Sequence, residues 1–135
     1  LADAVALVRT PDGPQMAVGV STHNREQALE AARGGADYIG FGPVFATGSK
    51  ANPDPTVGLD ALAEVVRAVT IPVVAIGGIT LDTIDAVAAT GAAACAVISA
   101  VERAADPTAA GRQIREAFER AAGRKGARKR ARSNS

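Results

Sequence analysis

The sequence has little of several residue types, and each shortage excludes a class of protein. Its one cysteine, Cys95, cannot form a disulfide within the chain, so nothing indicates an oxidising compartment. No apolar run reaches the roughly 18–20 residues that span a bilayer. The first residues, LADAVALVRT, lack the basic region and the cleavage site of a signal peptide. We therefore expect a cytoplasmic protein without a membrane partner.

Aromatic residues are also scarce, and this narrows the fold class. Among 135 residues there are three Phe, one Tyr and no Trp, although 47% of the chain is hydrophobic. Ala, Val, Ile and Leu therefore carry the apolar mass, which suits parallel strands covered by helices. The length fits one domain that buries its own core. Cys95 lies in the apolar run AAACAVIS and is expected to be a small buried residue rather than a reactive thiol.

Charge is unevenly distributed along the chain. Residues 1–119 hold 8 basic and 14 acidic residues, whereas residues 120–135 hold 7 basic residues and no acidic one. A run of like charges predicts a disordered, solvated segment. We therefore divide the chain into a domain over 1–122 and a basic disordered tail over 123–135, for which a nucleic-acid partner is not expected.

The pattern along the chain alternates between short apolar strands and amphipathic helices. Asn24 and Asp106 are placed to cap helices, and Pro107 suits a first helical position. Regular alternation with apolar strands predicts an α/β fold of parallel β/α units, about four of them. That number fits half of an eight-unit TIM barrel or a small open sheet. The predicted strands are Met16–Val20, Asp37–Phe41, Val73–Ile76 and Ala94–Ile98, and the predicted helices are Ala2–Arg9, Arg25–Arg33, Leu59–Val69, Leu81–Ala89 and a last helix from Pro107 to near Ala122.

Polar and glycine residues follow each predicted strand, where an α/β barrel collects its site residues. The second strand runs into a loop with two hydroxyls and an ammonium, and the third strand into a pair of glycines that allow close approach to an anion. Ile98 and Ser99 end the fourth strand. These features predict a site for a phosphorylated ligand. The loop residues are Thr47, Ser49 and Lys50, and the glycines are Gly77 and Gly78.

Two single residues have both a structural and a functional interpretation. Lys50 is the only lysine in residues 1–123 and could hold a diphosphate, although it could also be an ordinary solvated cation. His23 could act as a base or an anion donor, but a histidine beside a helix cap is more often structural. No Cys/His spacing or close carboxylate pair predicts a metal site.

Four linked motifs resemble the C-terminal half of the thiamine-phosphate synthase family, over about residues 1–120. They are GVSTHN (19–24), ADYIGFGPVFATGSK (36–50), IPVVAIGGIT (71–80) and AVISAV (96–101). The resemblance implies a (β/α)8 barrel that joins an aminopyrimidine diphosphate to a thiazole phosphate carboxylate. It implies Mg2+ as cofactor and release of diphosphate and CO2.

The same resemblance implies roles for individual residues. Ser21 and Lys50 would be catalytic and would bind the pyrimidine diphosphate. The thiazole phosphate would be bound by Thr47, Gly48, Ser49, Gly78, Ile98 and Ser99.

The chain departs from the family pattern in what it lacks. Ala46 stands where many members have proline, and the first four strands, which carry the Mg2+ ligands, have no counterpart here. Together with the absent initial Met, this predicts that the chain is inactive alone, or dimerises, or is a fragment of a longer enzyme that pairs with a missing N-terminal half. Two alternatives stay open: a thiazole tautomerase-like isomerase, against which Pro43 and Lys50 argue, and a noncatalytic phosphate-binding half barrel.

Overall fold

The computed structural model describes Val5, residues 16–48 and residues 55–133, with side chains as far as Arg124. Four parallel strands form one sheet in the order β1-β2-β3-β4. The predicted α/β fold of four parallel units is confirmed. The strands are β1 (Gly19–Thr22), β2 (Tyr38–Phe41), β3 (Val73–Ile76) and β4 (Ala94–Ala96), and the helices are α2 (Arg25–Arg33), α3 (Gly58–Ala68), α4 (Ile84–Thr90), α5 (Ser99–Glu102) and α6 (Pro107–Ser133).

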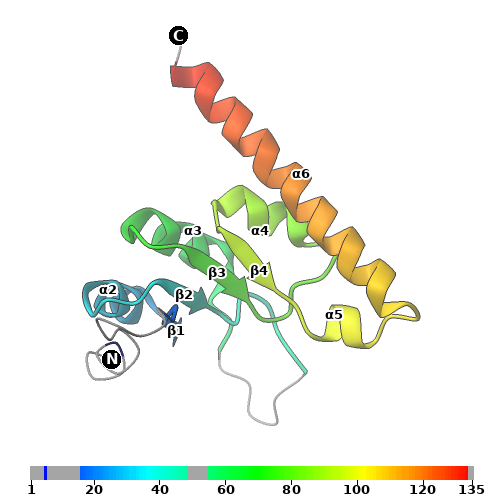
Figure 1. Cartoon of the computed structure of the whole chain (residues 1–135), viewed down its shortest axis with the longest axis horizontal. Helices are drawn as coiled ribbons and strands as arrows, with labels where there is room; N and C mark the ends of the chain where they lie inside the picture. The colour runs from blue at the N-terminus through cyan, green and yellow to red at the C-terminus, as the bar shows by residue number, and fades with distance from the viewer. Residues whose placement is uncertain (1–4, 6–15, 49–54, 134–135) are drawn as a thin grey trace.

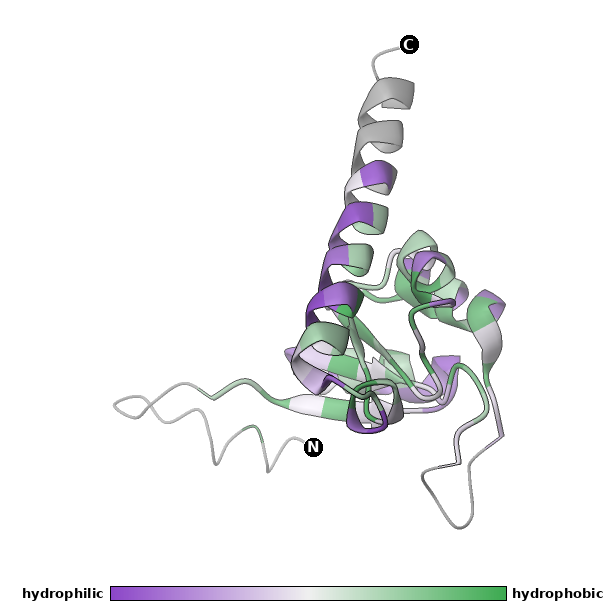
Figure 2. Ribbon diagram, turned by 90° about the vertical axis from the view of Figure 1, so that its right-hand side faces the viewer, coloured by the Kyte–Doolittle hydropathy of each residue, from purple (hydrophilic) through white to green (hydrophobic). Residues whose placement is uncertain are grey.

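One face of the sheet is covered by a layer formed by α2, α3 and α4 (Figure 1). Strand register places Thr22, Phe41, Ala75 and Cys95 in one row across the sheet. The first three are buried and Cys95 is half-buried, so this row faces the helices. Burial of apolar surface between the strands and the helix layer provides the core. Figure 2 shows hydrophobic residues gathered on the strands beneath these helices.

The neighbouring row faces away from the helices. Ser21, Gly40, Val74 and Ala94 align across the sheet, and none of them is buried. Side chains alternate between the two faces of a strand, so adjacent rows necessarily point in opposite directions. In a closed barrel this second face would line the interior. Here the four strands curve through half of such an arrangement and do not close.

Helix α6 packs along α4 and passes α5 (Figure 1). Its buried contacts come from Ile114, Ala117 and Ala121 at helical spacing. Asp106 caps it as predicted, because its side chain accepts a hydrogen bond from the Ala109 amide at 2.9 Å. The predicted end near Ala122 is wrong, since the helix continues to Ser133. The boundary between 122 and 123 therefore falls inside a helix, whose Ala, Arg and Lys residues are good helix formers.

Several other element ends differ from the sequence prediction. β1 begins at Gly19 rather than Met16, because its register is set by pairing Gly19 with Tyr38 and Thr22 with Phe41. Helix α4 begins at Ile84 rather than Leu81, because the Thr83 hydroxyl accepts from the Thr80 amide and closes a turn first. β4 ends at Ala96, two residues early. The predicted helix Ala2–Arg9 lies outside the described residues except for Val5.

Candidate functional site

A cavity of about 440 Å3 opens at the carboxyl ends of the strands. This is the edge of a parallel α/β sheet at which ligands bind. The loops after all four strands contribute to its wall, so residues far apart in the sequence converge there. No Asp, Glu, Lys or Arg is among the described residues that line it, which are His23, Gly42, Pro43, Thr47, Ile76, Gly77, Gly78, Ile79, Ala96, Val97, Ile98 and Ser99.

The loop after β2 is folded across the end of β3 by backbone hydrogen bonds. The Val44 amide donates to the Ile76 carbonyl at 2.8 Å, and the Phe45 amide donates to the Gly77 carbonyl at 3.1 Å. The chain enters this loop through a cis peptide between Gly42 and Pro43. These contacts place Thr47 on the wall of the cavity together with Gly78.

Position 78 requires glycine for two reasons, its backbone conformation and the lack of space for a side chain. Its φ of +64° lies in the left-handed region that favours glycine, and a Cβ there would collide with the Ala46 carbonyl oxygen. The same Cβ would lie 2.8 Å from the Phe45 Cβ. Any side chain at position 78 would therefore push the loop after β2 away from the end of β3. Glycine at position 78 is thus needed for close packing of this loop against the end of β3.

Ile98 and Ser99 also line the cavity. Helix α5 begins at Ser99, and the first-turn amides of a helix have no partner within that helix. Ile98 is 68% exposed despite its apolar side chain. The Ile98 carbonyl accepts from the Val101 and Glu102 amides, which fixes the turn into α5.

The structure brings together half of the sequence-predicted site. Thr47, Gly78, Ile98 and Ser99 all line the cavity. Two predicted residues do not line it: Ser21 is exposed on the uncovered face of β1, and Gly48 is exposed in the loop. The remaining two, Ser49 and Lys50, lie outside the described residues.

The sequence analysis did not select several residues of the cavity wall. Ile76, Ile79 and Val97 are strand and turn residues whose apolar character predicted a core position. Pro43 was used only to argue against the isomerase alternative and was not predicted to line a site. These residues could have been predicted from their position, because each lies at or beside the carboxyl end of a strand, where α/β barrels place their sites.

The residues resolved with side chains contain no cluster of three or more His, Cys, Asp or Glu that could hold a metal ion. Magnesium requires several oxygen ligands at octahedral geometry. The described residues therefore do not fit the metal that the family resemblance implies.

Burial raises the pKa of the Cys95 thiol, which lowers its thiolate fraction at neutral pH. Among the described helices, none has the length and apolar character of a membrane span.

Comparison with known proteins decides the family. The family model described as thiamine monophosphate synthase matches residues 2–101, which is most of the chain. The chain belongs to the thiamine monophosphate synthase family. The matched region contains the four motifs on which the sequence resemblance rested, and it contains β1 to β4 and every residue that lines the cavity.

Individual members of the family agree with this assignment. The chain is 54% identical over 115 residues to the thiamine-phosphate synthase of Anaeromyxobacter dehalogenans, covering 85% of this chain and 52% of the relative. It is 57% identical over 98 residues to that of Methanocella arvoryzae, covering 73% of this chain and 46% of the relative. The chain thus spans about half the length of these relatives.

A solved structure supports both the family and the fold. Thiamine phosphate pyrophosphorylase from Pyrococcus furiosus superposes with a TM-score of 0.72 at 36% sequence identity. The match covers 90% of this chain and 65% of that protein. The four-stranded sheet and its helices therefore have the arrangement that a larger family member shows over part of its length.

Proposed function

We propose that this chain supplies the phosphate-binding half of a thiamine-phosphate synthase. The complete enzyme would couple 4-amino-2-methyl-5-pyrimidinylmethyl diphosphate to a thiazole phosphate carboxylate, giving thiamine phosphate, diphosphate and CO2. The observation that carries the proposal is the convergence of Thr47, Gly78 and Ser99 on one cavity whose described lining contains no carboxylate. An anion would enter this cavity without meeting a negative charge on the described wall.

The thiazole phosphate would lie between the ends of β3 and β4. Gly78, Ile98 and Ser99 would present backbone to it, and Thr47, which lines the same cavity, would add its hydroxyl. Gly48 and Ser49, from the same loop, complete the proposed phosphate set. A cup made of backbone groups and hydroxyls binds phosphate by directional hydrogen bonds rather than by net charge.

Catalysis in this proposal is electrostatic. The C–O bond to diphosphate breaks first, leaving a pyrimidinylmethyl cation that the thiazole nitrogen attacks. Ser21 and Lys50 would bind the diphosphate, and the Lys50 ammonium would stabilise the negative charge that grows on it as it leaves. Ser21 lies on the uncovered face of β1, which would line the interior of a closed barrel.

The proposed reaction also needs parts from outside the described residues. We propose that Mg2+, where the enzyme uses it, is bound by an N-terminal half barrel, which would pair with the uncovered face of this sheet. A second copy of the chain could associate through the same face. Neither route changes the roles proposed for the residues above.

Calorimetry with the thiazole phosphate tests the phosphate cup. Ser99→Pro removes one backbone N–H at the cavity, and Thr108→Pro removes a first-turn N–H of α6 away from it. We expect the chain and Thr108→Pro to bind alike, and Ser99→Pro to bind about tenfold more weakly because one charge-assisted hydrogen bond is lost. Equal binding by all three proteins would contradict the proposal that the Ser99 amide binds the phosphate.

A complementation assay tests the transferase activity itself. The N-terminal half of a synthase relative is added to this chain, and thiamine phosphate formation is measured with both substrates. Turnover that requires both halves supports the proposed function. Phosphate binding without any turnover by the assembled halves would favour the noncatalytic half barrel.

A further inference from the structure

His23 lies on the wall of the cavity, and no role in the proposed reaction has been given to it so far. It follows β1 directly and precedes the cap of α2. Its side chain is exposed rather than packed into the core. It is also the only histidine in the sequence. The question is whether the imidazole only fixes the loop or also meets the ligand.

One nitrogen of the imidazole is already engaged. Nδ1 lies 2.7 Å from the Gly42 carbonyl oxygen. A carbonyl oxygen can only accept, so the proton of this hydrogen bond must be on Nδ1. In the neutral imidazole the other nitrogen, Nε2, then carries a lone pair and no proton. This tautomer is inferred from the partner of Nδ1, and it makes Nε2 a hydrogen-bond acceptor.

Both ends of this hydrogen bond are held in place. The His23 amide donates to the Gln27 side chain at 2.8 Å, and the Gln27 amide donates to Asn24 Oδ1 at 2.9 Å, so both bonds tie His23 and Asn24 to the first turn of α2. On the other side the Gly42 amide donates to the Thr22 carbonyl at 3.2 Å. A Cβ at Gly42 would collide with the Ile76 carbonyl oxygen. The imidazole is therefore attached to rigid backbone at both strand ends.

The two proposed substrates differ in what they could offer to a lone pair at Nε2. The aminopyrimidine carries an exocyclic amino group with two N–H donors. The thiazole phosphate carboxylate, with its acid groups ionised, presents acceptors only. Since His23 lines the cavity, an acceptor at its Nε2 would distinguish between them, because it would make an unfavourable acceptor–acceptor contact with the thiazole.

We propose that His23 is a specificity residue for the aminopyrimidine, whose amino group donates a hydrogen bond to Nε2 while Nδ1–H holds the Gly42 carbonyl. This inference rests on the proposed function, because it takes the aminopyrimidine as one occupant of the cavity. It assigns the end of β1 to the pyrimidine and leaves the ends of β3 and β4 to the phosphate. It involves no proton transfer, since the amino group keeps its protons.

The first test measures the tautomer without any ligand. With one histidine in the chain, long-range 1H–15N correlation of a 15N-histidine-labelled sample gives one imidazole spin system. We expect the neutral imidazole to carry its proton on Nδ1 and none on Nε2. A neutral imidazole with its proton on Nε2 would overturn the proposal, because that tautomer leaves no acceptor at Nε2.

The second test uses two probes, 4-amino-2,5-dimethylpyrimidine and its 4-dimethylamino analogue, which has the same ring but no N–H donor. We expect the amino probe to move the Nε2 signal and to bind about tenfold more tightly than the analogue. Equal binding of the two probes, or no response to either, would overturn the proposal. Binding of thiazole phosphate, measured in parallel, shows separately whether the phosphate cup works.

Two variants separate positioning of the loop from contact with the ligand. In His23→Asn, the side-chain NH2 can replace Nδ1–H toward Gly42, but nothing replaces Nε2. We expect it to keep the melting temperature of the wild type and to lose the preference for the amino probe. His23→Ala should lose both. A His23→Asn protein that retains the preference would show that His23 only fixes the loop.

Discussion

Two adjacent rows of residues cross the same four strands and have opposite surroundings. Thr22, Phe41, Ala75 and Cys95 face the helices, whereas Ser21, Gly40, Val74 and Ala94 face the uncovered side. Both rows are made mainly of small or apolar residues, so composition alone does not separate them. The difference teaches that what covers a sheet face, rather than its hydrophobicity, decides whether its residues carry stability or remain available to partners and ligands.

The largest expected effect comes from deleting an aromatic ring on the covered face. Phe41 is 1% exposed, and Phe41→Ala should lower the free energy of unfolding by about 3–5 kcal/mol through lost burial and a cavity. Tyr38, on the opposite face of the same strand, is 40% exposed, and Tyr38→Ala should cost about 1 kcal/mol. Urea unfolding followed by circular dichroism measures both. Similar losses for the two variants would remove the distinction between the faces.

A smaller loss of stability is expected at Gly78, which follows β3 and lines the cavity. Gly78→Ala places a Cβ at a φ of +64° and against the Ala46 carbonyl, and it should cost about 2 kcal/mol in stability. It should also abolish thiazole phosphate binding. Gly111→Ala is the matched control: Gly111 lies in α6 with open space around it, and the change should stabilise by about 0.5–1 kcal/mol. Tolerance of alanine at 78 would contradict the steric argument.

The helix layer depends on its caps as well as its apolar contacts. Asn24 Oδ1 accepts from the Gln27 amide at the start of α2, so Asn24→Ala should cost about 1 kcal/mol. Asn24→Asp retains an acceptor and should restore most of the loss. Thermal unfolding of the two variants measures the difference. An unchanged melting temperature for Asn24→Ala would mean that packing alone fixes this helix.

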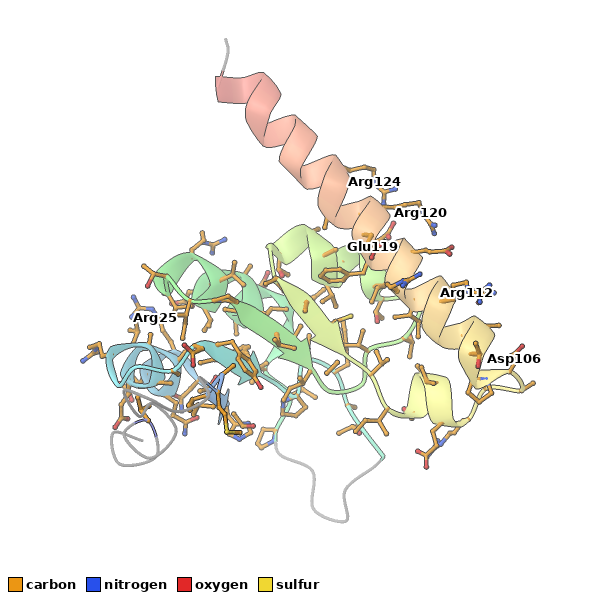
Figure 3. The ribbon with its side chains drawn as sticks, viewed as in Figure 1. Arg25, Asp106, Arg112, Glu119, Arg120 and Arg124 are labelled. Carbon is orange, nitrogen blue, oxygen red and sulfur yellow. The ribbon has the colours of Figure 1, made fainter. Side chains whose placement is uncertain are left out.

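The smallest effect is expected for a surface ion pair that joins α6 to α4. Arg124, labelled in Figure 3, reaches the Asp85 carboxylate at 2.9 Å, and the two side chains are 62% and 66% exposed. Arg124→Ala should cost no more than about 0.5 kcal/mol, because solvent and salt screen exposed pairs. The difference should vanish in high salt. A larger or salt-independent loss would point to packing by the Arg124 side chain instead.

Several local features of the fold were predictable because they depend on neighbours in the sequence. Strand β3 has the predicted bounds Val73–Ile76, and Asn24 and Asp106 cap helices as expected. The failures had both distant and local causes. β1 is set by its register with β2, and α4 starts late because of the Thr80–Thr83 turn. The continuation of α6 to Ser133 shows that like charges alone were a poor guide to its end.

The candidate site likewise contains residues that were predicted and found at the cavity, and residues that were not. Thr47, Gly78, Ile98 and Ser99 were predicted from motifs and meet in the cavity, because strand ends of a parallel sheet share one edge. Ser21 was predicted from the resemblance but lies on the uncovered face, outside this cavity. Its proposed contact stays a prediction, as do those of Gly48, Ser49 and Lys50. His23 was interpreted mainly as structural because it stands beside a helix cap, and its contact with Gly42, in another loop, was not predicted.

By itself the sequence determined the alternation of strands and helices, the family motifs and the glycines at the cavity, because periodicity and backbone preference act over a few residues. Only the tertiary structure decided which sheet face is covered, that the loop after β2 folds across β3, and that the imidazole of His23 is bound to Gly42. These features join residues about 20 or more positions apart, and their energies arise only when the strands are already side by side.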